Sequence, residues 1–538
     1  MRLFSITILL CFTLQLTLLA QSIQNISLLA QVEYEVKSSD IWGYTDENGR
    51  EYALVGLETG TSIVDIGDPS NPVEIARIPG GQSLWKDIKT YENRAFITGE
   101  YEQGLQIIDL SNLPNGVDSS QHFFWQESFE LGRLGACHNI YIEEKTGVAY
   151  LSGCNVVTGG VLMFDITGEL PVYLGKTNTT YSHDVYVRND TIYSADINSG
   201  VFSIIDVTNK NNPKVIANQR TPFQVTHNTW LSDNGKTIYT TDELGNAPVA
   251  AYDISDVHDI KALDQFYPDG TRGTGLSPHN VHVKNDFLVT SYYAEGVIIT
   301  DASRPNNLIQ VGKFDTYQGP NADFYGAWGA FPFFESDIIL VTDIENGLFI
   351  LKPNYLRAVF FEGTVTDSIS NEKLSDVQIE GVNRGVTVFE SRTGIDGRFE
   401  LGTTQTGNLR ITFSKEGYHS ETATVRFVNG ELAQLSVNLS PIDSTDNTTS
   451  LESLDLLTAF AASPNPFLTQ TTIQYELASS TKNAHFVLTD ISGKLVQQTS
   501  LSTLEGRLTV DSALEKGLYF GQIITSEGKS RVLKLVRL

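Results

Sequence analysis

The sequence is poor in cysteine, methionine and basic residues. Its 538 residues include three Cys and two Met, and 37 Lys and Arg stand against 64 Asp and Glu, which gives a formal net charge of −27. This shortage of positive charge argues against a nucleic-acid-binding protein, because such binding depends on cationic contacts to phosphate. It also argues against a protein that attaches to an anionic membrane surface.

Long apolar runs are missing after residue 20, so no later stretch approaches the ~20 apolar residues that a membrane-spanning helix needs. Arg2, the apolar run from Leu3 to Leu19 and the small residue Ala20 predict a secretory signal peptide over residues 1–20. A membrane anchor is the alternative, but no basic stop-transfer flank follows. Cys11 lies inside the apolar run, which disfavours lipoprotein processing. We therefore expect an exported mature chain with no transmembrane segment.

Familiar catalytic motifs are also missing. The sequence has no Gly-x-Ser-x-Gly, no His-Glu-x-x-His, and no phosphate-binding Gly loop followed by Lys. We therefore assign no catalytic residue, no metal ligand and no cofactor, and expect that the chain is not an enzyme.

Two cysteines remain after the signal peptide, Cys137 and Cys154. Export permits a disulfide. The residues between them are typical of strand, turn and strand, and a turn centred between Lys145 and Thr146 puts the two cysteines opposite each other. We therefore predict a Cys137–Cys154 disulfide; two small buried thiols are the alternative.

Glycine and aromatic residues are frequent, with 44 Gly, 22 Tyr and 27 Phe. This composition indicates many short strands joined by tight turns. Charged residues make up 19% of the chain, which argues against wholesale disorder. A chain of this length accommodates about three to four domains.

A repeat organises residues 25–353. Its first sign is an aliphatic run that ends in Asp. These residues are Asp65, Asp109, Asp165, Asp206, Asp253 and Asp301, and a seventh run at 348–351 lacks the Asp. Each Asp lies at the end of a predicted strand, where Asp caps turns. The second sign, called the mark here, is a residue pair 22–27 residues upstream of each Asp. The marks are Trp42-Gly43, Lys86-Asp87, His138-Asn139, His183-Asp184, His227-Asn228, His279-Asn280 and Trp328-Gly329.

Successive marks lie 44 to 52 residues apart. A period in this range, with several strands in each unit, is typical of a propeller blade. Seven copies predict an all-β protein with a seven-bladed β-propeller. The last copy lacks a fourth strand, and residues 25–34 read as a fourth strand without a blade, so we expect them to complete blade seven and cover its edge.

Residues 21–357 resemble the LVIVD-repeat propellers of the choice-of-anchor B family. The resemblance rests on the runs that end in Asp, on Cys137-His138-Asn139-Ile140 and on Gly159-Gly160. It implies an exported bacterial propeller and no particular reaction.

Residues 358–440 are similar to the carboxypeptidase regulatory-like domain, a small transthyretin-like β-sandwich. The similarity rests on Gly363-x-Val365-x-Asp367, Asp396-Gly397-x-Phe399 and Lys415-x-Gly417-Tyr418. It implies a structural spacer without a catalytic residue.

Residues 441–457 are polar and rich in strand-breaking residues, which indicates a linker. Residues 458–538 then resemble the C-terminal sorting domain of type IX secretion, on the basis of Pro464-Asn465-Pro466-Phe467, Asp490-x-x-Gly493-Lys494 and Gly517-Leu518-Tyr519. The resemblance implies a second β-sandwich, a Bacteroidetes-type bacterium, the type IX secretion machinery as a partner, and removal of this domain at the cell surface. Without the resemblance, these residues indicate a small β-sandwich with a cationic tail.

The marks supply a candidate site. Side chains alternate across a strand, so one of two rings is expected at the channel mouth. The candidate ligand-binding residues are His138, His183, His227, His279, Asp87, Asn139, Asp184, Asn228 and Asn280. Imidazoles bind transition metals and carboxylates add charge. Alternatively, each His bonds to the backbone of the next blade and only satisfies a buried polar group.

Two other residue sets leave alternatives open. Acidic residues precede the third strands, where a carboxylate pair for glycoside hydrolysis competes with solvated loop residues. They are Glu58, Glu100, Asp196, Asp242, Glu243 and Asp343. A set of aromatic residues suits either sugar stacking or blade packing. They are Trp85, Phe123, Phe124, Trp125, Tyr292, Tyr293, Tyr325 and Trp328.

Together these observations predict a secreted or outer-surface β-propeller that binds an extracellular glycan or protein. The alternative is a secreted hydrolase or lyase with a His/Asx site at the channel mouth.

Overall fold

The computed structural model describes residues 23–538 except 127, 130, 321–323, 443–456, 478–483, 492–493, 502, 511–513, 526–527 and 531. The predicted signal peptide lies outside the described residues, as does most of the predicted linker. Within the described residues the chain is all-β, as predicted, and the one helical element there is a single 3-10 turn, η1 (Ser119–Gln121). None of the helices in this part of the chain has the length and apolar character to cross a membrane.

The described part of residues 23–353 forms seven antiparallel sheets of four or five strands, numbered here in chain order. Sheet 1 has β3 (Ser38–Thr45), β4 (Glu51–Leu57), β5 (Gly60–Asp65) and β6 (Val73–Pro79). Sheet 2 has β7 (Lys86–Tyr91), β8 (Arg94–Gly99), β9 (Leu105–Asp109) and β10 (His122–Trp125). Sheet 3 has β13 (Asn139–Glu143), β14 (Val148–Ser152), β15 (Leu162–Asp165) and β16 (Val172–Lys176). Sheet 4 has β17 (Val185–Val187), β18 (Thr191–Asp196), β19 (Val201–Asp206) and β20 (Lys214–Arg220).

The remaining three sheets repeat this order. Sheet 5 has β21 (Thr226–Leu231), β22 (Thr237–Asp242), β23 (Val249–Asp253) and β24 (Lys261–Phe266). Sheet 6 has β25 (Val281–Lys284), β26 (Phe287–Ser291), β27 (Val297–Asp301) and β28 (Ile309–Phe314), with β1 (Ile23–Gln24) added at the β28 edge. Sheet 7 has β29 (Ala327–Phe331), β30 (Ile339–Asp343), β31 (Gly347–Pro353) and β2 (Ile26–Val32). A separate ribbon pairs β11 (Ser128–Phe129) with β12 (Gly132–Arg133).

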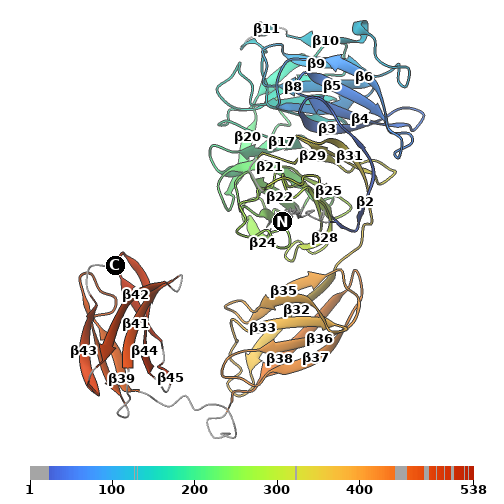
Figure 1. Cartoon of the computed structure of the whole chain (residues 1–538). Helices are drawn as coiled ribbons and strands as arrows, with labels where there is room; N and C mark the ends of the chain where they lie inside the picture. The colour runs from blue at the N-terminus through green and yellow to red at the C-terminus, as the bar shows by residue number, and fades with distance from the viewer. Residues whose placement is uncertain are drawn as a thin grey trace, which may run out of the picture. The chain divides into compact units, whose positions relative to one another are not determined.

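The strand from the start of the chain closes sheet 7 (Figure 1). β2 pairs antiparallel with β31, with Ile26 opposite Pro353 and Val32 opposite Leu348. The pairing brings residues more than 300 positions apart into one sheet. It leaves β31 with a neighbour on both sides, which removes one exposed strand edge.

The first strands of the sheets, called the inner strands here, contact one another in sequence. β3 contacts β7, and the contacts continue through β13, β17 and β21 to β25. β29 contacts β26 of sheet 6 on one side and β3 of sheet 1 on the other. The series of sheets therefore returns to its start.

Neighbouring sheets pack through aliphatic and aromatic side chains. Sheets 1 and 2 share one such core, which contains Tyr52, Leu54, Ile63, Ile88, Ile97 and Ile108. Burying each of these side chains stabilises the fold by about 1.5–3 kcal/mol. The second and third strands are buried almost throughout, whereas fourth strands such as β6 are half exposed. This gradient explains the near-continuous apolar runs in the middle of each repeat.

The repeated Asp residues cap turns, as predicted. In all six copies a carboxylate oxygen accepts the backbone N–H two residues further on, at 2.8–3.0 Å. Asp301 also accepts Arg357 Nη1 at 2.7 Å and the Ala358 N–H at 2.8 Å, which anchors the segment leading to the next module.

Two further modules follow. The first has two sheets, ordered β35-β32-β38 and β34-β33-β36-β37, which share one apolar core. Its strands are β32 (Val359–Asp367), β33 (Gln378–Asn383), β34 (Val386–Arg392), β35 (Arg398–Thr403), β36 (Gly407–Ser414), β37 (Glu421–Phe427) and β38 (Leu432–Leu439). The second lies in a separate compact unit that begins at Ile442. Its strands are β39 (Leu457–Ser463), β40 (Thr471–Leu477), β41 (Ala484–Asp490), β42 (Leu495–Leu501), β43 (Glu505–Val510), β44 (Gly517–Thr525), β45 (Gly528–Lys529) and β46 (Leu533–Arg537).

Candidate functional sites on the inner strands

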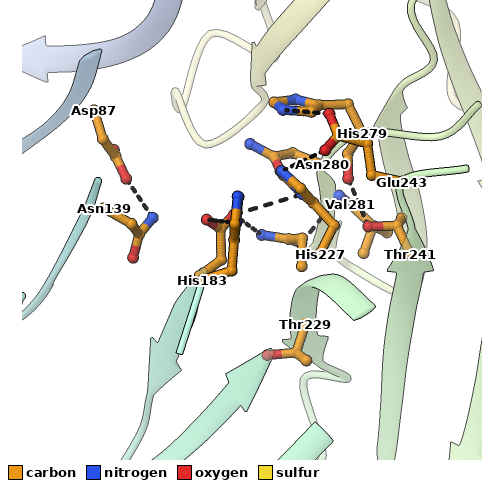
Figure 2. Close-up of polar contacts among 12 residues, drawn as sticks. Asp87, Asn139, His183, His227, Thr229, Thr241, Glu243, His279, Asn280 and Val281 are labelled. Atoms are coloured by element: carbon orange, nitrogen blue, oxygen red, sulfur yellow. Dashed lines mark hydrogen bonds and ion pairs between the residues drawn. The ribbon is translucent and has the colours of Figure 1, made fainter. Parts of the chain in front are cut away.

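Asp and Asn side chains near the start of the inner strands join several of the neighbouring sheets. Asp40 accepts the N–H of Ile88 at 2.8 Å, and Asp87 accepts the N–H of Ile140 at 3.2 Å. Asn139 accepts the N–H of Val185 at 3.1 Å in the same way. Farther round, Asn228 accepts the N–H of Val281 at 3.2 Å. We call these side chains, with Asp184 and Asn280, the Asx layer; Figure 2 shows the Asp87–Asn139 contact.

In sheet 1 the Asx position is Asp40, two residues before the mark predicted at Trp42-Gly43. Asp40 makes the sheet-to-sheet bond, whereas Trp42 lies farther along β3 and donates its indole N–H to Thr90 Oγ1 at 3.2 Å. The phase predicted for this repeat was wrong, since Asp40 and not Gly43 takes the Asx position. Sheet-to-sheet bonding, which the sequence does not display, identifies the equivalent residue.

The four mark histidines come together as a row of rings. His138 and His183 have ring centroids 4.0 Å apart, and His183–His227 and His227–His279 follow at 4.4 Å each. Trp328 continues the row, 4.1 Å from His279. Figure 2 shows His183, His227 and His279 side by side. Trp85 ends the row, stacked on Trp328 at 4.4 Å.

Acidic side chains flank this row at two points. Glu100 accepts His138 Nδ1 at 3.0 Å. Glu243 lies 3.7 Å from His227 Nε2 and 3.9 Å from His279 Nε2, beyond ordinary hydrogen-bond length. Glu243 also accepts a hydrogen bond from the Tyr293 hydroxyl. Both acids belong to the set that precedes the third strands, and only the folded chain shows which members reach the histidines.

The imidazoles differ in protonation. Burial lowers the pKa of His227 well below its ordinary value and lowers the pKa of His279 to about 3. Burial is the largest single influence on His138 and lowers its pKa, but the hydrogen bond to Glu100 and the charges of nearby carboxylates together outweigh burial, so the pKa is raised. The same bond lowers the pKa of Glu100. At neutral pH His227 and His279 are therefore neutral imidazoles, which is the form that binds transition metals.

The space between the Asx layer and the histidines is small. It has a volume of about 20 Å³ and is bordered by Asp40, Asp87, His138, His227, His279 and Trp328, among others. This is enough for a water molecule or an ion. Two groups there have ligand atoms within 4.8 Å of one another: His138 with His183 and Asp184, and His227 with Glu243 and His279.

Lysine side chains border the same region. Lys89 Nζ donates to Asp87 and lies 3.8 Å from Asp40 Oδ2. Although burial opposes it, these carboxylates raise the pKa of Lys89. Burial lowers the pKa of Lys86 to about 8, and its ammonium donates to the carbonyls of Ser83 and Glu58 at 2.7 and 3.1 Å.

A larger cavity opens at the other end of the inner strands. Its volume is about 970 Å³. Its aromatic lining consists of Trp42, Tyr44, Tyr91, Tyr141, Tyr186, Trp230, Phe331, Phe333 and Phe334. Charged groups including Lys89, Glu143 and Arg188 also border it. We call this space the aromatic cavity.

The rings of the aromatic cavity lie against one another along its wall. Tyr141 and Tyr186 have centroids 5.1 Å apart, and Tyr186 and Trp230 are 4.5 Å apart. Trp230 stacks on Phe333 at 5.5 Å, and the Lys89 ammonium lies 4.4 Å from the Trp42 ring. The predictions from the sequence did not include this cavity. A signal existed, because Trp42, Lys89, Tyr141, Tyr186 and Trp230 each lie two residues after an Asx position.

Most of the aromatic residues singled out from the sequence serve packing instead. Trp125 lies 5.3 Å from Phe164 of the neighbouring sheet, and Tyr292 donates to the carbonyl of Ala247 at 2.9 Å. Phe123 and Tyr325 are exceptions, since they are 43% and 41% exposed.

Cys137 and Cys154 form a disulfide. They lie just beyond the paired ends of β13 and β14, where Asn139 pairs with Ser152. The register that places them opposite each other is the one expected from a turn at Lys145. The disulfide restrains the position of Cys137, the residue that precedes His138.

Family models match three segments of the chain. Residues 50–78 match the LVIVD repeat, residues 361–440 the carboxypeptidase regulatory-like domain, and residues 462–537 the secretion system C-terminal sorting domain. The three modules predicted from the sequence are confirmed in that order. None of these models describes an enzyme.

No curated protein matches the sequence. Among solved structures, the crystal structure of Raptor from Chaetomium thermophilum is similar at 8% identity with a TM-score of 0.47. That match covers 62% of this chain and 30% of Raptor, so the chain spans less than a third of that protein's length.

These matches define the class of protein: an all-β protein with an LVIVD repeat at residues 50–78, a carboxypeptidase regulatory-like domain and a sorting domain. More particularly, the sorting domain is that of type IX secretion, which marks a protein as exported and either attached to the cell surface or released from it. The prediction of a secreted or outer-surface location is confirmed.

Proposed function

We propose that sheets 1–7 form a seven-bladed β-propeller that binds a carbohydrate in the aromatic cavity. The volume of about 970 Å³ lies within the range of small-molecule sites. The aromatic faces suit the apolar face of a sugar ring, and the charged groups at the cavity suit its hydroxyls. The cavity is the observation on which this proposal depends.

The other modules serve export and spacing in this proposal. Residues 358–440 act as a β-sandwich spacer, and residues 458–538 form a second β-sandwich that engages the type IX machinery and is then removed. We place the propeller at residues 21–357, closed by residues 25–34, and the linker at residues 441–457. Membership of the choice-of-anchor B family stays a prediction, as does the Bacteroidetes-type host.

A glycan array probed with the exported chain tests the ligand. We expect binding to one glycan class and a loss of about tenfold in affinity for Trp42→Ala and Tyr141→Ala, because each removes one ring contact. Phe123→Ala is the matched control, since this exposed aromatic lies outside the cavity. Equal losses in all three variants, or no glycan bound, contradict the proposal.

A further inference from the structure

We propose that His227, Glu243 and His279 bind one first-row transition-metal ion of the zinc class. His227 belongs to β21, and Glu243 follows β22 of the same sheet. His279 precedes β25 of sheet 6. The ion would therefore connect two adjacent sheets near the start of their inner strands. This site is separate from the aromatic cavity.

The spacing of the three side chains suits a shared ion. His227 Nε2 and His279 Nε2 lie 3.7 and 3.9 Å from the two Glu243 oxygens. Ligands about 2.0–2.2 Å from one tetrahedral ion lie roughly 3.4 Å apart. The observed separations are thus too long for hydrogen bonds and within a few tenths of an ångström of a coordination shell.

The orientation of His279 provides independent support. Its Nδ1 lies 2.5 Å from the carbonyl oxygen of Trp328, so Nδ1 carries the proton and donates it there. The other ring nitrogen, Nε2, is then an acceptor, and it faces a carboxylate. This Nε2 is buried and has no hydrogen-bond partner among the described residues. An acceptor aimed at a carboxylate calls for a cation between them.

The surroundings resemble the outer sphere of a metal site. Metal-binding histidines usually direct the second ring nitrogen to a carboxylate or backbone carbonyl. His279 fits this pattern, since its Nδ1 donates to the carbonyl of Trp328. His227 Nδ1 lies 3.8 Å from Asp184 Oδ2, beyond hydrogen-bond length, and has no hydrogen-bond partner among the described residues. The Tyr293 hydroxyl donates to Glu243. Two of the three proposed ligands, His279 and Glu243, therefore have an orienting hydrogen bond.

The neighbouring group of His138, His183 and Asp184 is the weaker candidate. There, His138 Nδ1 is hydrogen-bonded to Glu100 at 3.0 Å and His183 Nδ1 to Asp184 at 3.1 Å. These contacts have ordinary hydrogen-bond lengths, so they need no bridging cation.

The donor set indicates both the kind of ion and its role. Two imidazoles with one carboxylate suit zinc-class ions, whereas calcium and magnesium prefer oxygen ligands. The adjoining space of about 20 Å³ admits a water as fourth ligand and excludes an organic substrate. The ion would stabilise the junction of sheets 5 and 6.

The test measures metal in the full exported chain, purified without a histidine tag. After stripping with chelator and adding Zn²⁺, we expect one ion per chain by elemental analysis. Glu243→Gln and His279→Ala should weaken Zn²⁺ binding at least about 100-fold, and Tyr293→Phe about 10-fold, as for an outer-sphere partner. Zn²⁺ should also raise the unfolding temperature of the native sequence and leave that of Glu243→Gln unchanged.

His138→Ala is the matched control, since it removes a ring from the same row outside the proposed ligand set. It should keep stoichiometric zinc. If His279→Ala does not fold, the near-isosteric Glu243→Gln decides. The proposal is overturned if the native chain binds no Zn²⁺ at micromolar concentration, if Glu243→Gln retains it, or if His138→Ala loses it equally. None of these measurements uses a glycan, so they leave the proposed function untouched.

Discussion

The two ends of the inner strands contrast sharply although the same strands build both. At the Asx layer, short polar side chains reach sideways to the next strand, and about 20 Å³ of space remains. Two residues farther along, large rings lie against their neighbours and border a cavity of about 970 Å³. The Asx end thus joins sheets by hydrogen bonds, and the aromatic end encloses space.

This difference shows that one position of the repeat can hold neighbouring sheets together, while the position two residues later, on the same face of the strand, can bind a ligand. Changes at the Asx end should therefore alter stability. Changes at the aromatic end should alter ligand affinity with little effect on stability. The following variants test this division, beginning with the largest expected effect.

Asp87→Ala should destabilise the fold by about 3–5 kcal/mol, because it removes the carboxylate that the buried Lys89 ammonium bonds and leaves only the more distant Asp40, 3.8 Å away, to balance that charge. It also removes the acceptor for the Ile140 N–H. Urea unfolding measures the loss. Asp165→Ala, which removes only a strand-end cap, is the control and should cost distinctly less. Similar losses for the two variants would contradict a special role of the Asx layer.

Loss of the disulfide should cause the second-largest decrease in the free energy of unfolding. Cys137 and Cys154 are 17 residues apart in sequence, and a bridge that closes a loop of this length contributes about 3 kcal/mol. The Cys137→Ser/Cys154→Ser double variant should lose this amount in urea unfolding. Reductant should lower the stability of the native sequence alone; a native chain insensitive to reductant speaks against the bridge.

Asp343→Asn should stabilise the chain above pH 6. Burial raises the pKa of Asp343 to about 6, above its unfolded value of about 3.9. The folded state therefore holds this proton more tightly, and that stabilising contribution is lost as pH rises from about 4 to 6. Because Asn carries no charge, the variant should gain on the order of 2 kcal/mol relative to the native sequence at pH 7.

Unfolding free energies measured at pH 4 and pH 7 check the Asp343 prediction. The gain of the variant should be present at pH 7 and nearly absent at pH 4. An equal gain at both values would show that packing, and not ionisation of Asp343, is responsible.

Tyr141→Phe at the aromatic end should change stability least, by about 1 kcal/mol or less, because only a hydroxyl is lost. It should still alter glycan affinity if the hydroxyl contacts the ligand. Parallel urea unfolding and glycan titration separate the two effects. A stability loss as large as that of Asp87→Ala would contradict the proposed difference between the Asx end and the aromatic end of the inner strands.

The organisation of the chain was accessible from its sequence because it depends on local chemistry. Runs that end in Asp predicted strand ends with capped turns, and Asp65 and Asp206 make those caps. Sequence motifs also predicted the order of the LVIVD-repeat segment, the carboxypeptidase regulatory-like domain and the sorting domain, which the family models confirm. The mark at Trp42 was wrong because the phase of the repeat did not identify Asp40, whose bond to the Ile88 N–H defines the equivalent position.

The candidate sites were accessible only in part. Repetition indicated that His138, His183, His227 and His279 share one position, and they do lie in one row. The sequence did not distinguish Glu243 from the five other acidic residues that precede third strands. Its proximity to His227 and His279 depends on the conformation of its loop. The aromatic cavity was overlooked although its residues recur at a constant offset from the Asx positions.

Periodicity, turn chemistry and export signals can be read directly from the sequence, and they specify an exported all-β protein with repeated sheets. His279 contacts both Glu243 and the backbone carbonyl of Trp328, and the inner strands border about 20 Å³ at one end and about 970 Å³ at the other, because of how separate sheets meet. The reason is physical: propensities and caps act over a few residues, whereas coordination and cavity shape arise between side chains far apart in sequence.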